Sequence, residues 1–294
     1  MYNKKVNIII PTFNKLSRLK LMIQSLEKQI NKNFEVIFID DGSTDGTGHY
    51  IQHSRFNFPF IYFFQKNKGR AAARNLGLEN SNSEIIIFTD DDVILHPDFI
   101  DGHLQTIKEN KCISHGVIYE LPFLKFFADP SEPKIEKANN NYSLLKENRI
   151  VKEDINYEFD KKVYKLKRLS SLELLIKEIL TKKRRICDWI SFTGGNIAAP
   201  RSWLLDIGGF DNNFSLNWGC EDMELGYRLF MNSKPFLYNN NSINYHMTHM
   251  RKNYQVEHEQ SSQYFYNLYH DKNILLFHDF VIGKISWRKF LEVI

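Results

Sequence analysis

The chain has 294 residues, of which 43% are hydrophobic and 25% charged, and its formal net charge is +4. This length accommodates one large α/β domain or two smaller ones, and the small positive charge does not indicate nucleic-acid binding. Three widely spaced cysteines argue against a disulfide framework or a cysteine metal site. With no signal-peptide pattern and no apolar run that could span a bilayer, we expect a cytoplasmic protein, and peripheral membrane contact stays open.

The first 110 residues alternate strand and helix patterns. The strand-like apolar runs lie at 6–10, where Pro11 is expected to end the strand, and at 34–39, 60–64 and 85–88. Strands separated by helices predict parallel βαβ units, and therefore a Rossmann-like nucleotide-binding domain. Neither GxGxxG nor GxxxxGK[ST] is present, so the sequence supports neither a dinucleotide fold of the usual sort nor a P-loop.

Three helices are expected between these strands. Asn14 is placed to cap the first, whose apolar residues recur at helical spacing. These residues are Leu16, Leu19, Ile23, Leu26 and Ile30. A short helix is expected over 71–73, and another over 99–107.

Three carboxylates, Asp90, Asp91 and Asp92, directly follow the fourth strand. Adjacent acids repel one another, and a divalent metal that carries a nucleotide diphosphate is the economical explanation. A solvated acidic turn is the alternative. Two further polar clusters, 11–14 and 40–43, follow other strands and should share the same sheet edge, where they could hold a base and a ribose. Arg70 and Arg74 could reach this edge, or could simply be solvated.

Residues 120–185 differ from the preceding part, because prolines are followed by a stretch rich in Asn, Lys and Glu. Ser170 to Glu173 resembles a capping box that opens an amphipathic helix, which is followed by the basic run 182–185. Such a helix can lie on an anionic membrane or on an acidic partner, or it can pack on its own domain.

Paired glycines at 194–195 and 208–209 permit a close approach of backbone to a ligand. Glu221 and Asp222 fall at the start of a helix, where the dipole favours ionised carboxylates, and they could be no more than capping residues. The neighbouring Trp218 could stack on a sugar ring. His246 and His249, combined with carboxylates, form a plausible Mn²⁺ or Mg²⁺ set, although a lone histidine is often structural. The aromatic tail from 264 to 294 has no evident function.

Together these stretches resemble the inverting family 2 glycosyltransferases of the GT-A fold. The matching blocks are 8–14, 36–45, 67–75 and 88–92, while 194–196 through 218–222 resembles the acceptor half shared with galactosyl- and N-acetylgalactosaminyltransferases. The resemblance implies an α/β protein with a Rossmann-like, mostly parallel sheet, a smaller acceptor-side subdomain and a helical tail. The expected segments are 1–115 (nucleotide-sugar half), 116–185 (variable insertion), 186–250 (acceptor and catalytic half) and 251–294 (tail).

The resemblance also implies roles for individual residues. Asp92 would ligate the metal, Asp90 would lie nearer the ribose as the other acid of a DxD motif, and His246 or His249 would complete the ligand set. Asp222 would be the catalytic base, with Glu221 beside it. Donor binding would fall to Pro11, Thr12, Asn14, Asp40, Asp41, Arg70, Arg74, Asp91, Gly195, Asn196 and Trp218.

We therefore expect a metal-dependent inverting hexosyltransferase that uses Mn²⁺ or Mg²⁺ and a UDP-sugar (Gal, GalNAc, Glc or GlcNAc). The acceptor would be a hydroxyl of a glycan, a lipid-linked sugar or a peptide, in bacterial surface-glycan or peptide glycosylation. One alternative is an inactive GT-A-fold scaffold or glycan-binding protein, although both DxD acids and Asp222 are present. The other is a sugar-phosphate nucleotidyltransferase, for which the chain lacks a glycine-rich, lysine-bearing triphosphate loop. The sequence does not indicate the sugar, the acceptor or the oligomeric state.

Overall fold

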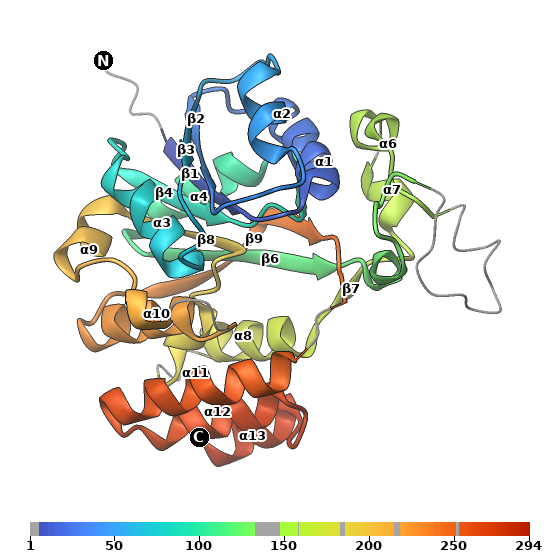
Figure 1. Ribbon diagram of the computed structural model, residues 1–294. Helices are drawn as coiled ribbons and strands as arrows, with labels where there is room; N and C mark the ends of the chain where they lie inside the picture. Colours follow the sequence, from blue (N-terminus) through green and yellow to red (C-terminus); the bar gives the residue numbers. More distant parts are fainter. Residues whose placement is uncertain (1–5, 133–147, 158, 183–185, 215–217, 251–252) are drawn as a thin grey trace.

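A nine-stranded mixed sheet runs through the part of the chain that the computed structural model describes, residues 6–132, 148–157, 159–182, 186–214, 218–250 and 253–294 (Figure 1). The strand order is β3-β2-β1-β4-β8-β6-β9-β5, and β7 pairs with β6. The strands are β1 (Val6–Thr12), β2 (Phe34–Asp40), β3 (Phe60–Phe64), β4 (Ile85–Thr89), β5 (Val93–Leu95), β6 (Ile113–Glu120), β7 (Arg168–Leu169), β8 (Asn196–Pro200) and β9 (Phe236–His246).

The four strands β3, β2, β1 and β4 are parallel, as the alternation of strands and helices predicted. Both of their faces are covered, since Ile9 packs into one core while Ile8 and Ile10 pack into the other, and this explains the unbroken apolar runs. Pro11 does not end the first strand. It continues to Thr12 in register with β2, because proline is compatible with extended backbone near a strand end.

The other half of the sheet brings distant segments to the carboxyl end of β4. Strand β8 runs antiparallel to β4, and β9 runs parallel to β6 and antiparallel to β5. In this register His246 stands beside Glu120 on one side and beside Val93 on the other. Strands from 1–115 and from 186–250 thus share one sheet, and the segment boundaries given above stay a prediction.

Helices cover both faces of the sheet. Helices α1 (Leu16–Glu27), α2 (Thr47–His53) and α4 (Phe99–Asn110) cover one face. The other face carries α3 (Arg70–Glu79), α8 (Ser171–Thr181), α9 (Arg201–Asp206), α10 (Glu221–Met231), α11 (Tyr254–Tyr269), α12 (Lys272–Val281) and α13 (Trp287–Val293). Short 3₁₀ turns lie at η1 (Pro122–Phe126), η2 (Asp188–Ser191) and η3 (Asn212–Phe214).

The start of α1 differs from the expectation. Lys15, not Asn14, occupies the N-cap position, and the Leu16 N–H donates to Oδ2 of Asp45 from the neighbouring loop. The side-chain oxygen of Asn14 accepts from the Thr44 N–H instead, because Asn14 has a left-handed backbone (φ 52°) that turns it away from the helix. Ile30 lies beyond the helix and is 61% exposed, so it is not part of the apolar face.

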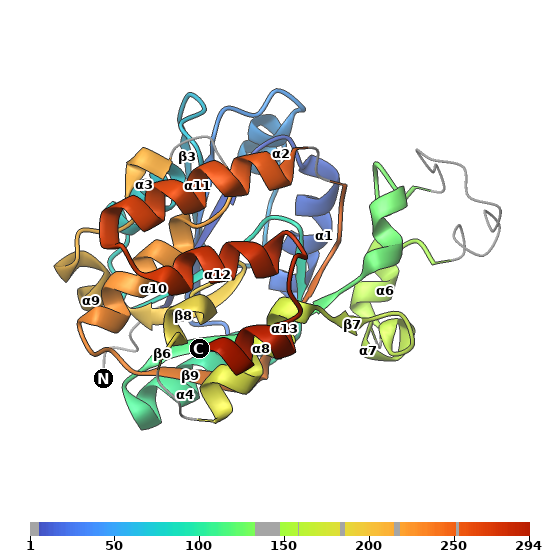
Figure 2. The same ribbon diagram turned by 90° about the horizontal axis from the view of Figure 1, so that it is seen from below.

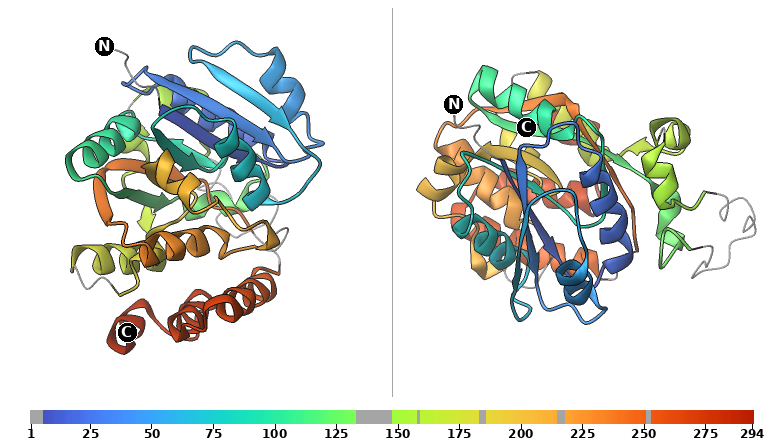
Figure 3. Two further views of the ribbon diagram at one scale, coloured as in Figure 1. Left: turned by 90° about the vertical axis from the view of Figure 1, so that its left-hand side faces the viewer. Right: turned by 90° about the horizontal axis from the view of Figure 1, so that it is seen from above.

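The C-terminal helices form a layer below the sheet (Figures 2 and 3). Phe265, Phe277 and Phe290 from this layer are buried in the same core as the apolar stripe of α8. Helix α8 therefore packs on its own domain, which leaves its stripe unavailable to a membrane. Ser170 caps this helix by accepting from the Glu173 N–H, but the Glu173 carboxylate turns to Tyr238, so only half of the expected capping box forms. Residues 183–185 of the basic run lie outside the described residues.

The insertion contributes a projecting arm with α6 (Lys152–Asn156) and α7 (Phe159–Val163), which stands away from the main body (Figure 1). Leu124, Phe127 and Val163 of this segment pack in one cluster with Leu21 of α1 and Tyr245 of β9, and this cluster attaches the arm to the sheet. None of the described helices combines the length and the apolar character that crossing a membrane requires.

Candidate functional site

A cavity of about 770 Å³ lies at the carboxyl ends of the parallel strands. The loops after β1, β2 and β4 line one end, and the strand ends of β6 and β9 line its side. The start of α10 and parts of α8, α11 and α12 complete the wall. Residues from the N-terminal half, the insertion and the tail therefore enclose one space.

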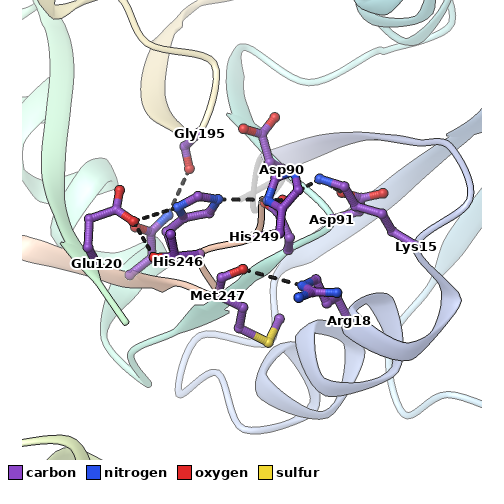
Figure 4. Close-up of polar contacts among 12 residues, drawn as sticks. Lys15, Arg18, Asp90, Asp91, Glu120, Gly195, His246, Met247 and His249 are labelled. Carbon is purple, nitrogen blue, oxygen red and sulfur yellow. Dashed lines mark hydrogen bonds and ion pairs between the residues drawn. The ribbon is translucent and has the colours of Figure 1, made fainter. Parts of the chain in front are cut away.

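Asp92, His246 and His249 form a group whose ligand atoms all lie within 4.8 Å of one another. Figure 4 shows the two histidines of this group near Lys15 and Asp91. His246 Nε2 and His249 Nδ1 each lie 3.5 Å from Oδ2 of Asp92. On its other side, Nδ1 of His246 hydrogen-bonds the Glu120 carboxylate at 2.8 Å, which fixes the ring orientation. One carboxylate and two imidazoles suit a transition metal such as Mn²⁺ better than Mg²⁺, so this donor set fits the expected metal.

The charges of this group are strongly coupled. Burial opposes ionisation of Asp92, yet Lys15 and both histidines hold the pKa of its carboxyl well below the usual range. Burial likewise opposes protonation of His246, but Asp92 and Glu120 raise its pKa to about 10. A metal ion would therefore displace a proton from His246 as it binds.

Asp90 lies apart from this group and belongs to a second cluster. Arg74 is 2% exposed, and its guanidinium donates to Asp90 and to Glu221, each at 3.0 Å. Of the two predicted arginines, Arg74 is thus fully enclosed, while Arg70 is 39% exposed and approaches Glu221 at 3.7 Å. Arg74 connects the loop after β4 to the first turn of α10.

Asp222 is held by two backbone groups at the start of α10. Its Oδ2 accepts from the Gly194 N–H and its Oδ1 from its neighbour Met223 N–H, both at 2.9 Å. Burial, followed by the adjacent Glu221 charge, raises the pKa of Asp222 to about 6, and Arg74 acts in the opposite direction. For Glu221 itself burial favours the neutral form, but Arg70 and Arg74 prevail and lower its pKa. The pair therefore has two different environments, and Asp222 is the better proton acceptor near neutral pH.

Among the predicted donor-binding residues, Pro11, Thr12, Asp41, Asp91, Gly195 and Trp218 line the cavity together with the residues described above. Asn14, Asp40 and Asn196 do not line it. The Asp40 carboxylate accepts hydrogen bonds from the Ser43 N–H and the Tyr62 hydroxyl. Asn196 is fully buried, where it bonds His103 and two backbone carbonyls.

The sequence analysis assigned no role to three residues that contact or line the site. Lys15 contacts Asp92, and Glu120 orients His246. Gly194 was expected to approach a ligand, and its N–H donates to Asp222. Asn67 lines the cavity with a buried side-chain oxygen that has no hydrogen-bond partner among the described residues. The register of β6 with β9 places Glu120 at the site, and no local pattern in the sequence signals that pairing.

Comparison with known proteins gives two family matches. The model described as glycosyl transferase family 2 matches residues 7–159, and the one described as N-terminal domain of galactosyltransferase matches residues 177–259. A curated relative, the uncharacterized glycosyltransferase YfnE of Bacillus subtilis, is 28% identical over 83% of this chain and 65% of its own. The chain spans less than two thirds of the length of the first curated relatives it matches.

Two solved structures share the fold at low sequence identity. TarS of S. aureus in complex with UDP-GlcNAc has a TM-score of 0.58 at 17% identity, covering 94% of this chain and 73% of that one. Mannosyltransferase PcManGT of Pyrobaculum calidifontis, in complex with GDP-Man and Mn²⁺, has a TM-score of 0.56 at 15% identity, covering 97% and 66% respectively.

Proposed function

Because the chain belongs to glycosyl transferase family 2 and has a GT-A fold, we propose that it transfers a sugar from a UDP-sugar to an acceptor hydroxyl with inversion, assisted by a divalent metal. The observation that carries this proposal is the shared cavity. The three candidate metal ligands, Asp222 and Trp218 line the same space.

The nucleotide half of the cavity favours a nucleoside diphosphate donor. Pro11, Thr12 and Asp41 line this half of the cavity. The Asp41 carboxylate accepts hydrogen bonds from the Lys68 and Gly69 N–H groups, which hold it in place. The unsatisfied oxygen of Asn67 can accept a hydrogen bond from a base or a ribose. TarS was solved with UDP-GlcNAc and PcManGT with GDP-Man, so these structures leave the base open. Uridine is proposed from the resemblance of the sequence blocks described above.

Asp92, His246 and His249 would hold the metal. When bound there, the metal would offset the negative charge that develops on the departing diphosphate. Glu120 would keep the His246 ring oriented for this role.

Asp222 would act on the acceptor. A sugar or peptide hydroxyl is a weak nucleophile, so a carboxylate within hydrogen-bond reach must take its proton during attack. The acceptor oxygen then bonds to the anomeric carbon, the bond from that carbon to the phosphate oxygen breaks, and the nucleoside diphosphate leaves. Attack from the face opposite the leaving group inverts the configuration, and no side chain needs to form a covalent intermediate.

The acceptor end of the cavity is built by segments outside the nucleotide half. Leu172 and Ile176 of α8, Met223 of α10 and Val281 of α12 line the cavity, as Trp218 does. A hydroxyl of a glycan, a lipid-linked sugar or a peptide is compatible with such a wall, in which Trp218 offers a ring for sugar stacking.

The proposal is tested by incubating the protein with Mn²⁺ and a panel of UDP-sugars and GDP-mannose, without acceptor, and measuring release of the free nucleotide. We expect slow release from one UDP-sugar, abolished by a chelator. Release from GDP-mannose alone would overturn the uridine assignment. A complete lack of nucleotide binding by calorimetry would favour an inactive scaffold.

A further inference from the structure

Lys15 reaches from the N-cap position of α1 into the acidic end of the cavity (Figure 4). Its ammonium hydrogen-bonds Oδ2 of Asp92 and lies 3.7 Å from Oδ1 of Asp91. These two carboxylates are almost completely buried, with side chains 3% and 7% exposed, whereas Lys15 is 24% exposed. The lysine is therefore one of the cations that offset the charge of the acidic pair, and its partly exposed side chain has room to move toward solvent.

The oxygen that Lys15 contacts is also the one on which the metal ligands converge. Both histidine nitrogens that could bind a metal lie 3.5 Å from Oδ2 of Asp92. A metal ion held by these three residues would therefore be bound through the same Asp92 oxygen that Lys15 contacts. An ammonium and a divalent cation held on one carboxylate oxygen repel each other strongly, because their separation would be only a few ångströms. The two cannot both occupy this position.

We propose that Lys15 is a built-in competitor for the metal, which must displace the lysine from Asp92 when it binds. This inference rests on the proposed function, since it takes the site to be one for a metal and a nucleoside diphosphate. The displaced ammonium remains at the wall of the cavity, facing the space where the diphosphate would lie. Binding of the metal without a nucleotide is thus disfavoured. Metal and donor bind together, because the diphosphate forms an ion pair with the displaced ammonium.

A permanent structural ion pair is the competing interpretation, and it makes a different prediction. If Lys15 only anchored α1 to the acidic loop, its removal would weaken the fold equally with and without metal. The ammonium would then stay beside the metal in every state, so its removal would strengthen Mn²⁺ binding equally with and without UDP. If metal and donor displace Lys15, its removal strengthens Mn²⁺ binding only without UDP, because in the donor complex the ammonium faces the diphosphate.

The experiment compares Lys15→Met with Lys20→Met, an exposed position on the same helix whose ammonium lies over the Tyr50 ring. Free Mn²⁺ is measured by electron paramagnetic resonance during titration of each protein, first alone and then with saturating UDP. Without nucleotide, Lys15→Met is expected to bind Mn²⁺ about tenfold more tightly than the unsubstituted protein, and Lys20→Met with unchanged affinity. With UDP this advantage should disappear, because the variant has lost the ammonium that faces the diphosphate.

Lys15→Gln provides a second variant that keeps a hydrogen-bond donor and removes the charge, and it should behave like Lys15→Met. Equal or weaker Mn²⁺ binding by both variants without nucleotide, or a gain of the same size with and without UDP, would overturn the competition. Intact Mn²⁺-dependent UDP binding in the unsubstituted protein would leave the proposed function standing. Absence of Mn²⁺ binding by the unsubstituted protein, with or without UDP, would overturn both.

Discussion

The Gly194 N–H donates to Oδ2 of Asp222 at 2.9 Å, and this bond joins the loop before β8 to the first turn of α10. Gly194 also lies against Arg74, since a Cβ added at Gly194 would come within 2.3 Å of the Arg74 Nη2. One residue without a side chain thus permits both the hydrogen bond to the proposed base and the enclosed guanidinium.

Gly194→Ala should therefore be strongly disruptive. The new methyl group would push the Arg74 guanidinium away from Asp90 and Glu221, so we expect a loss of about 1–3 kcal/mol in the free energy of unfolding and a large loss of activity. Chemical denaturation of the metal-free protein measures the first effect. Gly195→Ala is the matched control, because its added Cβ would come no closer than 3.3 Å to a neighbour, at Oδ2 of Asp90. Equal stability of Gly194→Ala and the unsubstituted protein would contradict the packing described here.

The pH dependence of transfer should report the Asp222 carboxyl. Its raised pKa of about 6 means that the base is ionised above that pH and protonated below it, so kcat/KM should fall as the pH drops through about 6. Glu221→Gln removes the like charge that helps to raise this pKa. The acid limb, which is the fall of kcat/KM at low pH, should therefore move to lower pH. Glu292→Gln, an exposed acid on α13, should leave the limb where it is. A limb that moves upward or stays fixed in Glu221→Gln would argue against Asp222 as the titrating group.

Glu120 should be required for metal affinity although it is not among the three candidate ligands. It accepts the His246 Nδ1 hydrogen bond and a second one from Thr248, and loss of such a partner typically costs 10–100-fold in metal affinity. Glu120→Ala should therefore weaken Mn²⁺ binding in the presence of UDP by about this factor, as measured by calorimetry. Glu120→Gln retains an accepting oxygen and should lose less. If both variants bound Mn²⁺ like the unsubstituted protein, the orienting role would be wrong.

The C-terminal helices should be part of the folding unit. Phe277 of α12 is 1% exposed, and its ring packs edge-on against the Trp189 ring at 5.8 Å between centroids. Phe277→Ala should cost about 3–5 kcal/mol in the free energy of unfolding, as measured by urea titration. Leu268→Ala on α11, where the side chain is 43% exposed, should change it by less than about 0.5 kcal/mol. A Phe277→Ala variant of full stability would show that the tail packs only loosely.

Local patterns were sufficient to predict the elements that local forces determine. The apolar runs predicted β1 to β4 because both faces of those strands are buried, and the acids at 90–92 were expected at a strand end because parallel strands place their loops at one edge. Glu221 and Asp222 were expected at the start of a helix, and α10 begins at Glu221.

Contacts between distant segments could not be predicted in this way. The cap of α1 comes from Asp45 in another loop, so the N-cap assignment of Asn14 was wrong. Lys15 contacts Asp92, which is 77 residues away in the chain, and the sequence around Lys15 does not indicate this contact. Asn196 resembles a loop residue in the sequence, but the pairing of β4 with β8 buries it in a polar network with His103.

The most direct test of the whole account is Asp222→Asn, assayed with Mn²⁺ and the UDP-sugar that the unsubstituted protein hydrolyses. The account predicts that the rate of UDP release falls by about 10²–10⁴-fold, because the amide cannot take a proton, while UDP affinity by calorimetry stays unchanged. An unchanged release rate would contradict the role of Asp222 as the base.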